Sequence, residues 1–473
     1  MKHPESYRDQ EVIVLGLAKS GVQVAKVLHS YGAVVTVNDQ KDRDQCPEAG
    51  ELESLGISVI CGGHPDNLVH PGISLLVKNP GIPYRVQPIQ KALELGIEVV
   101  TEVEVAYHIC NAPIIGITGS NGKTTTTTWV GQMLEEVGMR PIVAGNIGTP
   151  LCEAAQNADS SNWMVTELSS FQLKGTEEFR PRVGCLLNLA ETHLDYHGGM
   201  EDYVSSKAKI FANMGEGDTA VLNWDDSYCR ELVPYIKAKL LPFSTNEELV
   251  EGVYVSPPFI PDVEDSLSRK IVYRDEHGQI TDIIPVEEVG IPGRFNIANA
   301  AAACAISIAA GAPADRLSGP LSSFRGVEHR LEYVMNLHGV AFYNNSKATN
   351  SKATTMALTS FHEPIVLIAG GLDRGSDYME LMAVLSERVK AIVVFGQTAQ
   401  KIAKVAEIAG LKHIVVVDNE EDAANTLRSA VKEAAAAAEA GDIVLLSPAC
   451  ASWDMFTSYE ERGRIFKEAV HNL

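Results

Sequence analysis

Near residue 120 a short apolar run is followed by a glycine-rich turn and then by a row of threonines. Residues 116–128 read Gly-Ile-Thr-Gly-Ser-Asn-Gly-Lys-Thr-Thr-Thr-Thr-Thr, and Pro113-Ile114-Ile115 precede them. This order predicts a buried strand, a tight loop and a helix N-terminus, which is a building unit of parallel α/β sheets. Backbone N–H groups around Gly119 and Gly122, aided by the helix dipole, would hold phosphate oxygens. The segment therefore predicts a nucleoside triphosphate site.

The residues of this loop have separate predicted roles at the nucleotide. Lys123 would neutralise the outer phosphates, and the Thr124 hydroxyl would be offered to Mg²⁺. The predicted ATP-binding residues of the loop are Gly119, Ser120, Asn121, Gly122, Lys123, Thr124 and Thr125. The general pattern G-x-x-x-x-G-K-T would place a glycine at Ile117, whereas the nearest glycine is Gly116. The alternative is an ordinary glycine-rich turn between a strand and a helix.

The length and the apolar pattern predict the domain organisation. A chain of 473 residues exceeds the roughly 250–300 residues at which a single core stops growing. Short β-branched runs alternate with helical patterns almost throughout, which predicts an α/β protein with parallel sheets. We expect a Rossmann-like N-terminal domain (1–101), a central P-loop ATPase domain (102–326) and a Rossmann-like C-terminal domain (327–473). The segment 243–289 predicts irregular strands and loops added to the central domain.

Charge and cysteine usage exclude several classes of protein. The net charge of −22 works against a broad nucleic-acid surface or an anionic membrane patch. The eight cysteines include no C-x-x-C pair, which favours reduced thiols. Residues 1–10 are polar, and no later run approaches the ~18 apolar residues of a membrane helix. We expect a cytoplasmic monomer without nucleic-acid or membrane partners.

The N-terminal block carries a weaker nucleotide signal. The turn Gly16-Leu17-Ala18-Lys19-Ser20-Gly21 keeps the first and last glycines of a dinucleotide fingerprint, but Ala18 replaces the glycine of close approach. Asp39 follows the second predicted strand, where a ribose-binding acid would stand. A nucleotide or nucleotide-sugar site and simple packing both remain open.

Polar residues follow two predicted strands of the central block. Glu167 ends the strand 165–167, where it would hold Mg²⁺ directly or through water, and the alternative is an acid at a helix N-terminus. His193 follows the strand 186–188 and is a candidate metal ligand or a structural histidine. Lys207 by itself is typical of an exposed helical lysine.

Four motifs of the central block occur in one order. They are the loop 119–124, the Glu-Leu-Ser-Ser-Phe-Gln that begins at Glu167, the Thr-His-Leu-Asp around His193, and Lys207 in Ser-Ser-Lys-Ala-Lys-Ile-Phe. This order resembles the central domain of the Mur ligases, which couple ATP hydrolysis to amide-bond formation. The resemblance implies that Lys207 is carbamylated by CO₂ and surrounds Mg²⁺ together with Thr124, Glu167 and His193. The implied catalytic residues are Lys123, His193, Lys207 and Lys347.

The same resemblance implies further nucleotide contacts. Asn299 in Gly-Arg-Phe-Asn-Ile-Ala-Asn would lie near adenine, and Arg330 would offset phosphate charge in the transition state. In Asn-Asn-Ser-Lys-Ala-Thr-Asn, Asn345 stands where the family usually has aspartate. We count Asn345 among the ATP-binding residues and leave its role open.

Motifs near the C-terminus resemble those of the family members that add D-glutamate. These motifs are residues 370–375 and 447–456, and the Asp-Asn-Pro-Arg motif of the meso-diaminopimelate-adding members is absent from the sequence. Lys347 and Arg374 would supply the positive charges that bind a dicarboxylic amino acid. The implied D-glutamate site is Lys347, Thr349, Arg374, Ser452 and Tyr459. The implied UDP-sugar site is Gly16, Leu17, Ala18, Asp39, Asn79, Asn146 and His193.

The implied activity is ATP-dependent ligation of D-glutamate to UDP-N-acetylmuramoyl-L-alanine through an acyl phosphate, in peptidoglycan precursor synthesis. The substrates would be these two compounds and ATP, with Mg²⁺ as cofactor. One alternative is a ligase of the same superfamily that adds another amino acid or acts on folate. A nucleotide-gated binding protein is a second alternative. A nicotinamide oxidoreductase built on the first domain is a third, which the missing middle glycine disfavours.

Overall fold

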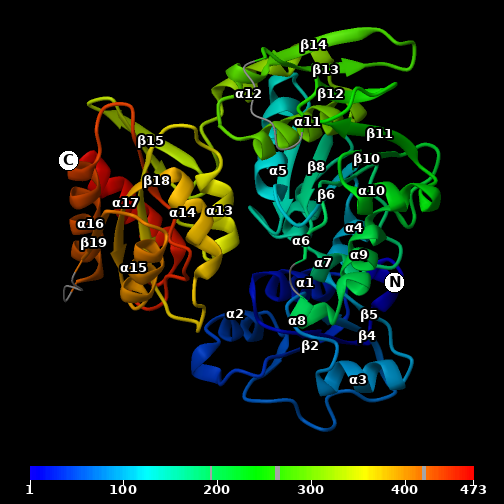
Figure 1. Cartoon of the computed structure of the whole chain (residues 1–473). Coiled ribbons are helices and arrows are strands. Elements are labelled where there is room, and N and C mark those ends of the chain that lie inside the picture. The colour runs from blue at the N-terminus through cyan, green and yellow to red at the C-terminus, as the bar shows by residue number, and fades with distance from the viewer. Residues whose placement is uncertain (192–193, 261–266, 418–421) are drawn as a thin grey trace. The chain divides into compact units, whose positions relative to one another are not determined.

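The computed structural model describes residues 1–191, 194–260, 267–417 and 422–473 (Figure 1). It divides into two compact units, one formed by residues 1–288 and 298–322 and the other by residues 289–297 and 323–473. The first unit holds two β-sheets and the second holds one. The predicted α/β fold with parallel-rich sheets is confirmed. In the described ranges, no helix combines the length and the apolar character needed to cross a bilayer.

The first sheet is parallel, with the strand order β3-β2-β1-β4-β5. Its strands are β1 (Glu11–Leu15), β2 (Val34–Asn38), β3 (Ser58–Ile60), β4 (Ile73–Lys78) and β5 (Val99–Val100). Its helices are α1 (Lys19–Ser30), α2 (Glu48–Ser54), α3 (Gln87–Glu94) and α4 (Glu102–Ile109). Leu15 pairs with both Asn38 and Lys78, so the carboxyl ends of β1, β2 and β4 lie at one edge. The chain reverses direction across the sheet between β1 and β4, where open α/β sheets bind ligands.

The second sheet has nine strands in the order β14-β13-β12-β11-β10-β9-β6-β8-β7. The strands are β6 (Ile114–Thr118), β7 (Arg140–Gly145), β8 (Asn162–Glu167), β9 (Val183–Leu186), β10 (Thr219–Asn223), β11 (Lys239–Ser244), β12 (Gly252–Ser256), β13 (Lys270–Arg274) and β14 (Ile280–Pro285). The helices are α5 (Lys123–Glu136), α6 (Leu151–Asn157), α7 (Ser170–Lys174), α8 (Leu194–His197), α9 (Met200–Ala208), α10 (Ser227–Leu232), α11 (Arg294–Ala309) and α12 (Ser318–Ser323). From β7 to β12 the strands are parallel.

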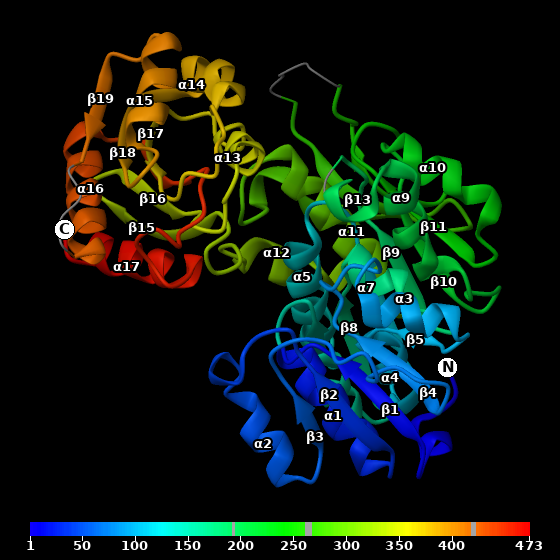
Figure 2. The ribbon, with the colours of Figure 1, turned by 90° about the horizontal axis from the view of Figure 1, so that it is seen from below.

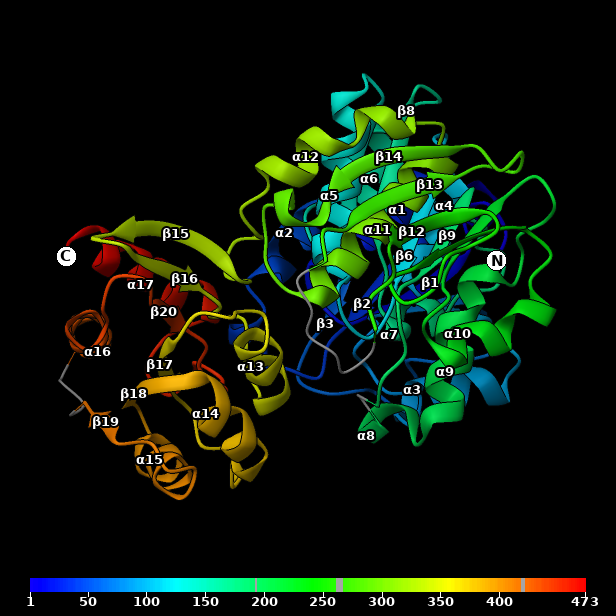
Figure 3. The ribbon, with the colours of Figure 1, turned by 45° about the horizontal axis from the view of Figure 1, so that its top comes forward.

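For segment 243–289 the sequence predicted irregular strands and loops added to the central domain, and the strands found there are regular. This segment includes regular strands, because β12, β13 and β14 pair antiparallel and extend the central sheet (Figure 3). Ile271, Val272 and Ile284 are buried, whereas charged residues such as Lys270 lie on the exposed side. An edge ribbon with one solvated face needs few apolar residues, which is why its composition was typical of loops.

The third sheet has the order β15-β16-β20-β17-β18-β19 and is parallel except for the β15–β16 hairpin. Its strands are β15 (Glu332–Leu337), β16 (Val340–Asn344), β17 (Ile365–Gly370), β18 (Val389–Phe395), β19 (His413–Val416) and β20 (Ile443–Leu446). Its helices are α13 (Ser351–Leu358), α14 (Met382–Arg388), α15 (Ala399–Ile408), α16 (Ala423–Ala437) and α17 (Tyr459–His471). Helices α13, α14 and α15 share one hydrophobic cluster with the sheet, and α16 and α17 share another (Figure 2). Helices therefore cover both faces, as buried parallel strands require.

Candidate active site

The glycine-rich loop joins β6 to α5, as the sequence predicted. Gly122 has φ +82°, and a Cβ atom there would lie 2.1 Å from Oδ1 of Asn299. The backbone conformation and this close contact both require glycine. The structure thus brings Asn299, which is 5% exposed, against the loop.

Asn188 holds the loop in shape from the end of β9. The Asn121 N–H donates to Oδ1 of Asn188 at 2.9 Å, and Nδ2 of Asn188 donates to the Asn121 carbonyl at 3.1 Å. Oγ of Ser120 accepts from the Ala190 N–H at 2.9 Å and lies 2.8 Å from the Tyr203 hydroxyl. The sequence analysis missed Asn188 and Tyr203. The signal for Asn188 was a polar residue directly after a buried strand, next to the strand that carries the loop.

Glu167 lies beside the loop because β8 pairs with β6 in a register that places it next to Ile117. Its Oε2 accepts from Oγ1 of Thr124 at 2.8 Å, and its Oε1 accepts from Nδ2 of Asn146 at 2.9 Å. The side chain is 2% exposed. A hydroxyl and a carboxylate are oxygen ligands of the kind that Mg²⁺ prefers. Asn146, predicted for the UDP-sugar, therefore lies at this carboxylate in the central sheet.

Lys207 is 1% exposed, so the interpretation of an exposed helical lysine was wrong. Its Nζ donates to the Gly119 carbonyl at 2.8 Å and to Oγ1 of Thr118 at 3.2 Å. Desolvation by burial holds the pKa of Lys207 well below its ordinary value, Lys123 lowers it further, and Glu167 acts in the opposite direction. Lys123 also reaches the loop, because its Nζ donates to the carbonyls of Gly119 and Ser120 at 2.8 and 3.0 Å. Two lysine amines thus converge on one loop.

One predicted ligand, His193, lies outside the residues that the structure describes. Among the residues that are described, no group of three or more His, Cys, Asp and Glu side chains is arranged to hold a metal ion. The predicted magnesium set does not require such a group. Among the described residues of the predicted set, Glu167 is the one member that is a His, Cys, Asp or Glu. Thr124 and the carbamylated Lys207 would supply the other oxygen ligands.

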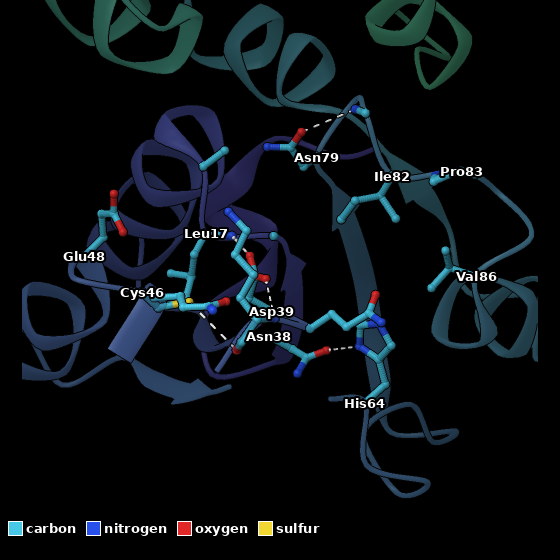
Figure 4. Close-up of a pocket in the computed structure, with 16 residues that line it drawn as sticks. Leu17, Asn38, Asp39, Cys46, Glu48, His64, Asn79, Ile82, Pro83 and Val86 are labelled. Atoms are coloured by element: carbon cyan, nitrogen blue, oxygen red, sulfur yellow. Dashed lines mark hydrogen bonds between the residues drawn. The ribbon is translucent and has the colours of Figure 1, made fainter. Parts of the chain in front are cut away.

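A cavity of about 450 Å³ lies at the carboxyl edge of the first sheet (Figure 4). The predicted UDP-sugar residues that line it are Gly16, Leu17, Ala18, Asp39 and Asn79. Oδ2 of Asp39 accepts from the Leu17 N–H at 2.7 Å, and Oδ1 of Asn79 accepts from the Gly81 N–H at 3.3 Å. The structure therefore assembles five of the predicted residues around one cavity.

His64 and Asn38 line the same cavity and were missed by the sequence analysis. Nδ1 of His64 lies 2.6 Å from Oδ1 of Asn38 (Figure 4). Nδ2 of Asn38 donates to the carbonyls of Ile60 and Gly63. Because an amide oxygen only accepts, Nδ1 carries a proton, and in the neutral form of the ring Nε2 is then an acceptor. The signal was the Gly62-Gly63-His64 turn after a predicted strand.

Lys78, at the end of β4, supports the loop that carries Asn79. It is 1% exposed, and its Nζ donates to the Pro80 carbonyl at 3.1 Å and to the Tyr196 hydroxyl at 3.3 Å. Desolvation by burial, with a smaller effect from Lys174, lowers the pKa of Lys78 to about 7.

This pKa predicts a pH-dependent stability. Between pH 7 and the ordinary lysine pKa of 10.5, the unfolded chain binds the proton and the folded chain does not. The free energy of unfolding therefore rises with pH in this window, by about 1 kcal/mol per pH unit from this one group. Urea unfolding of the first unit at pH 7.5 and 8.5 should show a steeper rise in the wild type than in Lys78→Met. Equal slopes in the two proteins would contradict the lowered pKa.

In the second unit, Arg330 lies in a tight turn that Asn345 braces. The flanking His329 and Leu331 have φ values of +65° and +44°. Oδ1 of Asn345 accepts from the Leu331 N–H at 3.2 Å, and its Nδ2 lies 3.1 Å from Oγ of Ser447. An amide can donate and accept at once, which gives Asn345 a structural role at a position that the sequence left open.

The predicted D-glutamate residues lie around the carboxyl edge of the third sheet. Nζ of Lys347 lies 5.5 Å from the ring centre of Tyr459, and the Arg374 guanidinium lies 4.7 Å from the ring of Trp453. Ser452 is 2% exposed, and Thr349 is half-buried. Trp453, which is 65% exposed, was not predicted; an aromatic residue between two predicted site residues was the signal. Asn299 and the first cavity belong to the first unit, whereas Arg330, Asn345 and these residues belong to the second.

Three family models match the chain. They are the Mur ligase MurD-like N-terminal domain over residues 10–101, the Mur ligase middle domain over 117–307, and the Mur ligase glutamate ligase domain over 329–450. Among solved structures, MurF from Acinetobacter baumannii has a TM-score of 0.58 at 16% identity and covers 99% of this chain and 93% of its own. MurF ligase from Thermotoga maritima in complex with ADP has a TM-score of 0.55 at 17% identity, with coverage of 100% and 97%. These structures share the fold.

Curated relatives match over the full length. A protein of Geobacillus sp. (strain WCH70) named UDP-N-acetylmuramoylalanine--D-glutamate ligase is 49% identical over 474 residues, covering 100% of both chains. The protein of the same name from Bacillus subtilis (strain 168) is 44% identical with the same coverage. With three family models along its length and relatives of this identity, the chain belongs to the Mur ligase family.

Proposed function

We propose that this chain ligates D-glutamate to UDP-N-acetylmuramoyl-L-alanine at the expense of ATP, a step of peptidoglycan precursor synthesis. The observation that carries the proposal is the 49% identity, over the whole of both chains, to a protein with that printed name. We also propose that it acts as a cytoplasmic monomer on these small molecules, without a nucleic-acid or membrane partner, in line with the net charge of −22.

The glycine loop would bind the ATP phosphates. Its backbone N–H groups and the start of α5 form an anion site. Lys123 now donates to two loop carbonyls, and we infer that these bonds are exchanged for phosphate oxygens when ATP binds. Asn299 would approach the adenine, and Arg330 would offset charge at the phosphates as the acyl phosphate forms.

The residues beside the loop fit Mg²⁺ and a carbamate. Oγ1 of Thr124 and the buried carboxylate of Glu167 supply oxygen ligands 2.8 Å apart, and His193 is the further ligand that the resemblance implies. CO₂ adds only to a neutral amine, and the burial that lowers the pKa of Lys207 favours this neutral form. When bound, Mg²⁺ would reduce the repulsion between the attacking carboxylate and the ATP phosphates.

The first cavity would hold the UDP part of the sugar nucleotide. Asp39 would accept from ribose hydroxyls, as acids after the second strand do in related folds. Nε2 of His64 offers a further acceptor. The 450 Å³ volume lies within the range of ordinary small-molecule sites.

The second unit would bind D-glutamate. Lys347 and Arg374 would pair with its carboxylates, and Thr349, Ser452 and Tyr459 would line the same pocket.

The reaction would proceed in two steps. The L-alanyl carboxylate attacks the γ-phosphate of ATP to give an acyl phosphate and ADP. The amine of D-glutamate then attacks the acyl carbon, the amide C–N bond forms and the amine loses a proton to solvent. The acyl C–O bond breaks, and phosphate leaves with the electron pair of that bond.

The first test is phosphate release from ATP in the presence of UDP-N-acetylmuramoyl-L-alanine and Mg²⁺. We expect release with D-glutamate and background release with L-glutamate, L-lysine or no amino acid. The control omits the sugar nucleotide, which should also give background release. Release with another amino acid would reassign the pocket of the second unit, and no release with any of them would contradict the ligase proposal.

A further inference from the structure

Arg462 lies in the first turn of α17, and its side chain is 0% exposed. Its Nη2 donates to the carbonyl oxygens of Ser346 at 2.8 Å and Cys450 at 3.1 Å. Its Nε donates to Oγ of Ser346 at 3.0 Å, and its Nη1 donates to the Ala451 carbonyl at 3.4 Å. One buried guanidinium therefore ties together two segments that are about a hundred residues apart in the sequence.

Each of these segments leads directly into a residue proposed to bind D-glutamate. Ser346 precedes Lys347, and Cys450 and Ala451 precede Ser452. The Ala451 carbonyl also accepts from the Leu372 N–H at 3.0 Å, two residues before Arg374. The guanidinium thus lies behind the three segments that carry the main contacts of the proposed amino-acid pocket.

The start of α17 is joined to the same group. Oγ of Ser346 accepts from Arg462 and donates to the Tyr459 carbonyl at 2.8 Å. Tyr459 in turn lies beside Lys347. A change at Arg462 would therefore shift Lys347 both through the Ser346 carbonyl and through Tyr459.

A buried apolar residue could fill this place in the helix more cheaply than a cation. Burial lowers the pKa of Arg462 to about 10, so the group is still charged at neutral pH while most of its hydration is lost. A lysine could not reproduce its contacts, because only the planar fork of arginine donates in fixed directions to several acceptors. The desolvation cost of this buried guanidinium is explained if its function is to fix the geometry of the surrounding backbone.

We propose that Arg462 is a positioning residue, which sets the spacing of Lys347, Ser452 and the Arg374 loop for the amino-acid substrate without touching that substrate. The inference rests on the proposed ligation of D-glutamate.

The experiment compares Arg462→Met and Arg462→Lys with wild type in the phosphate-release assay. We expect KM for D-glutamate to rise about tenfold or more in Arg462→Met, because several buried carbonyls lose their donor and the segments shift. KM for the sugar nucleotide should change less than about twofold, since its proposed cavity lies in the first unit. Arg462→Lys should fall between the wild type and Arg462→Met.

Two further variants serve as controls. Arg464→Met makes the same change at an exposed position of α17 and should leave KM for D-glutamate unchanged. Ser346→Ala removes one acceptor and one donor from the network while keeping the buried charge, and should raise KM for D-glutamate by a smaller factor. It keeps the test open if Arg462→Met does not fold, which thermal unfolding would reveal.

The outcomes separate the two proposals. If wild type does not use D-glutamate, the proposed function fails. If wild type uses D-glutamate but Ser346→Ala and every folded Arg462 variant keep its KM, the positioning role is overturned. A parallel loss of affinity for D-glutamate and for the sugar nucleotide would also overturn it, because that result describes general destabilisation.

Discussion

Lys123→Ala is expected to lower kcat for ATP-dependent ligation by about 10³-fold or more. The reason is that a preorganised cation at the transferring phosphoryl group lowers the activation barrier by several kcal/mol. The structure places this amine at the loop, 2.8 Å from the Gly119 carbonyl and 3.0 Å from the Ser120 carbonyl. The alanine variant should fold, since the amine is not part of the apolar core. The measurement is steady-state phosphate release with D-glutamate and the sugar nucleotide.

The matched control for Lys123 is Lys432→Ala, at an exposed position of α16, which should keep wild-type kcat. ATP binding by titration calorimetry adds a second readout, since Lys123→Ala should weaken it. Near-normal turnover in Lys123→Ala would remove the phosphate role of the loop and leave the ordinary strand-to-helix turn as its explanation.

Lys207→Ala is expected to be inactive, with partial recovery on addition of short carboxylates such as acetate or formate. The reason is that the alanine leaves room at a 1% exposed position, where an added carboxylate can replace the oxygens of the carbamate. Lys207→Arg keeps a cation and fills the site, so it should be inactive and should not recover. The measurement is phosphate release without carboxylate and at increasing concentrations of added carboxylate, at constant ionic strength.

A second readout detects the carbamate itself. With ¹³CO₂ in the buffer, a ¹³C carbamate signal should appear in the NMR spectrum of wild type and be absent from that of Lys207→Ala. Full activity of Lys207→Ala without added carboxylate would show that the carbamate is dispensable. Loss of activity without recovery, together with no carbamate signal in wild type, would leave Lys207 as a buried amine that supports the loop.

The elements that follow from local pattern were predicted well. The strand before Gly119 and the helix after Gly122 follow from an apolar run, a glycine turn and threonines, and β6 and α5 have these places. The strands of the third sheet follow from β-branched runs such as 365–369, which are buried on both faces. The strands β12–β14 were predicted only as irregular strands and their antiparallel pairing was missed, since they lie at an edge and need few apolar residues.

The candidate site divides in the same way. Gly119 to Thr124 are consecutive in the chain, so their shared site could be predicted from one short pattern. Asn188, His64 and Arg462 each have a partner more than twenty residues away in the sequence, which are Asn121, Asn38 and Ser346. No local pattern reports such partners.

The sequence by itself determined the α/β class, the phosphate loop and the order of the family motifs, because each depends on neighbouring residues whose spacing is set by the backbone. Only the tertiary structure decided that Lys207 is buried, that Asn146 lies at Glu167, and that Arg462 joins the segments of Ser346 and Cys450. The physical reason is that burial, and the pKa and hydrogen-bond partners that depend on it, is a property of what packs around a side chain. Those surroundings come from strand order and register, which bring distant segments together.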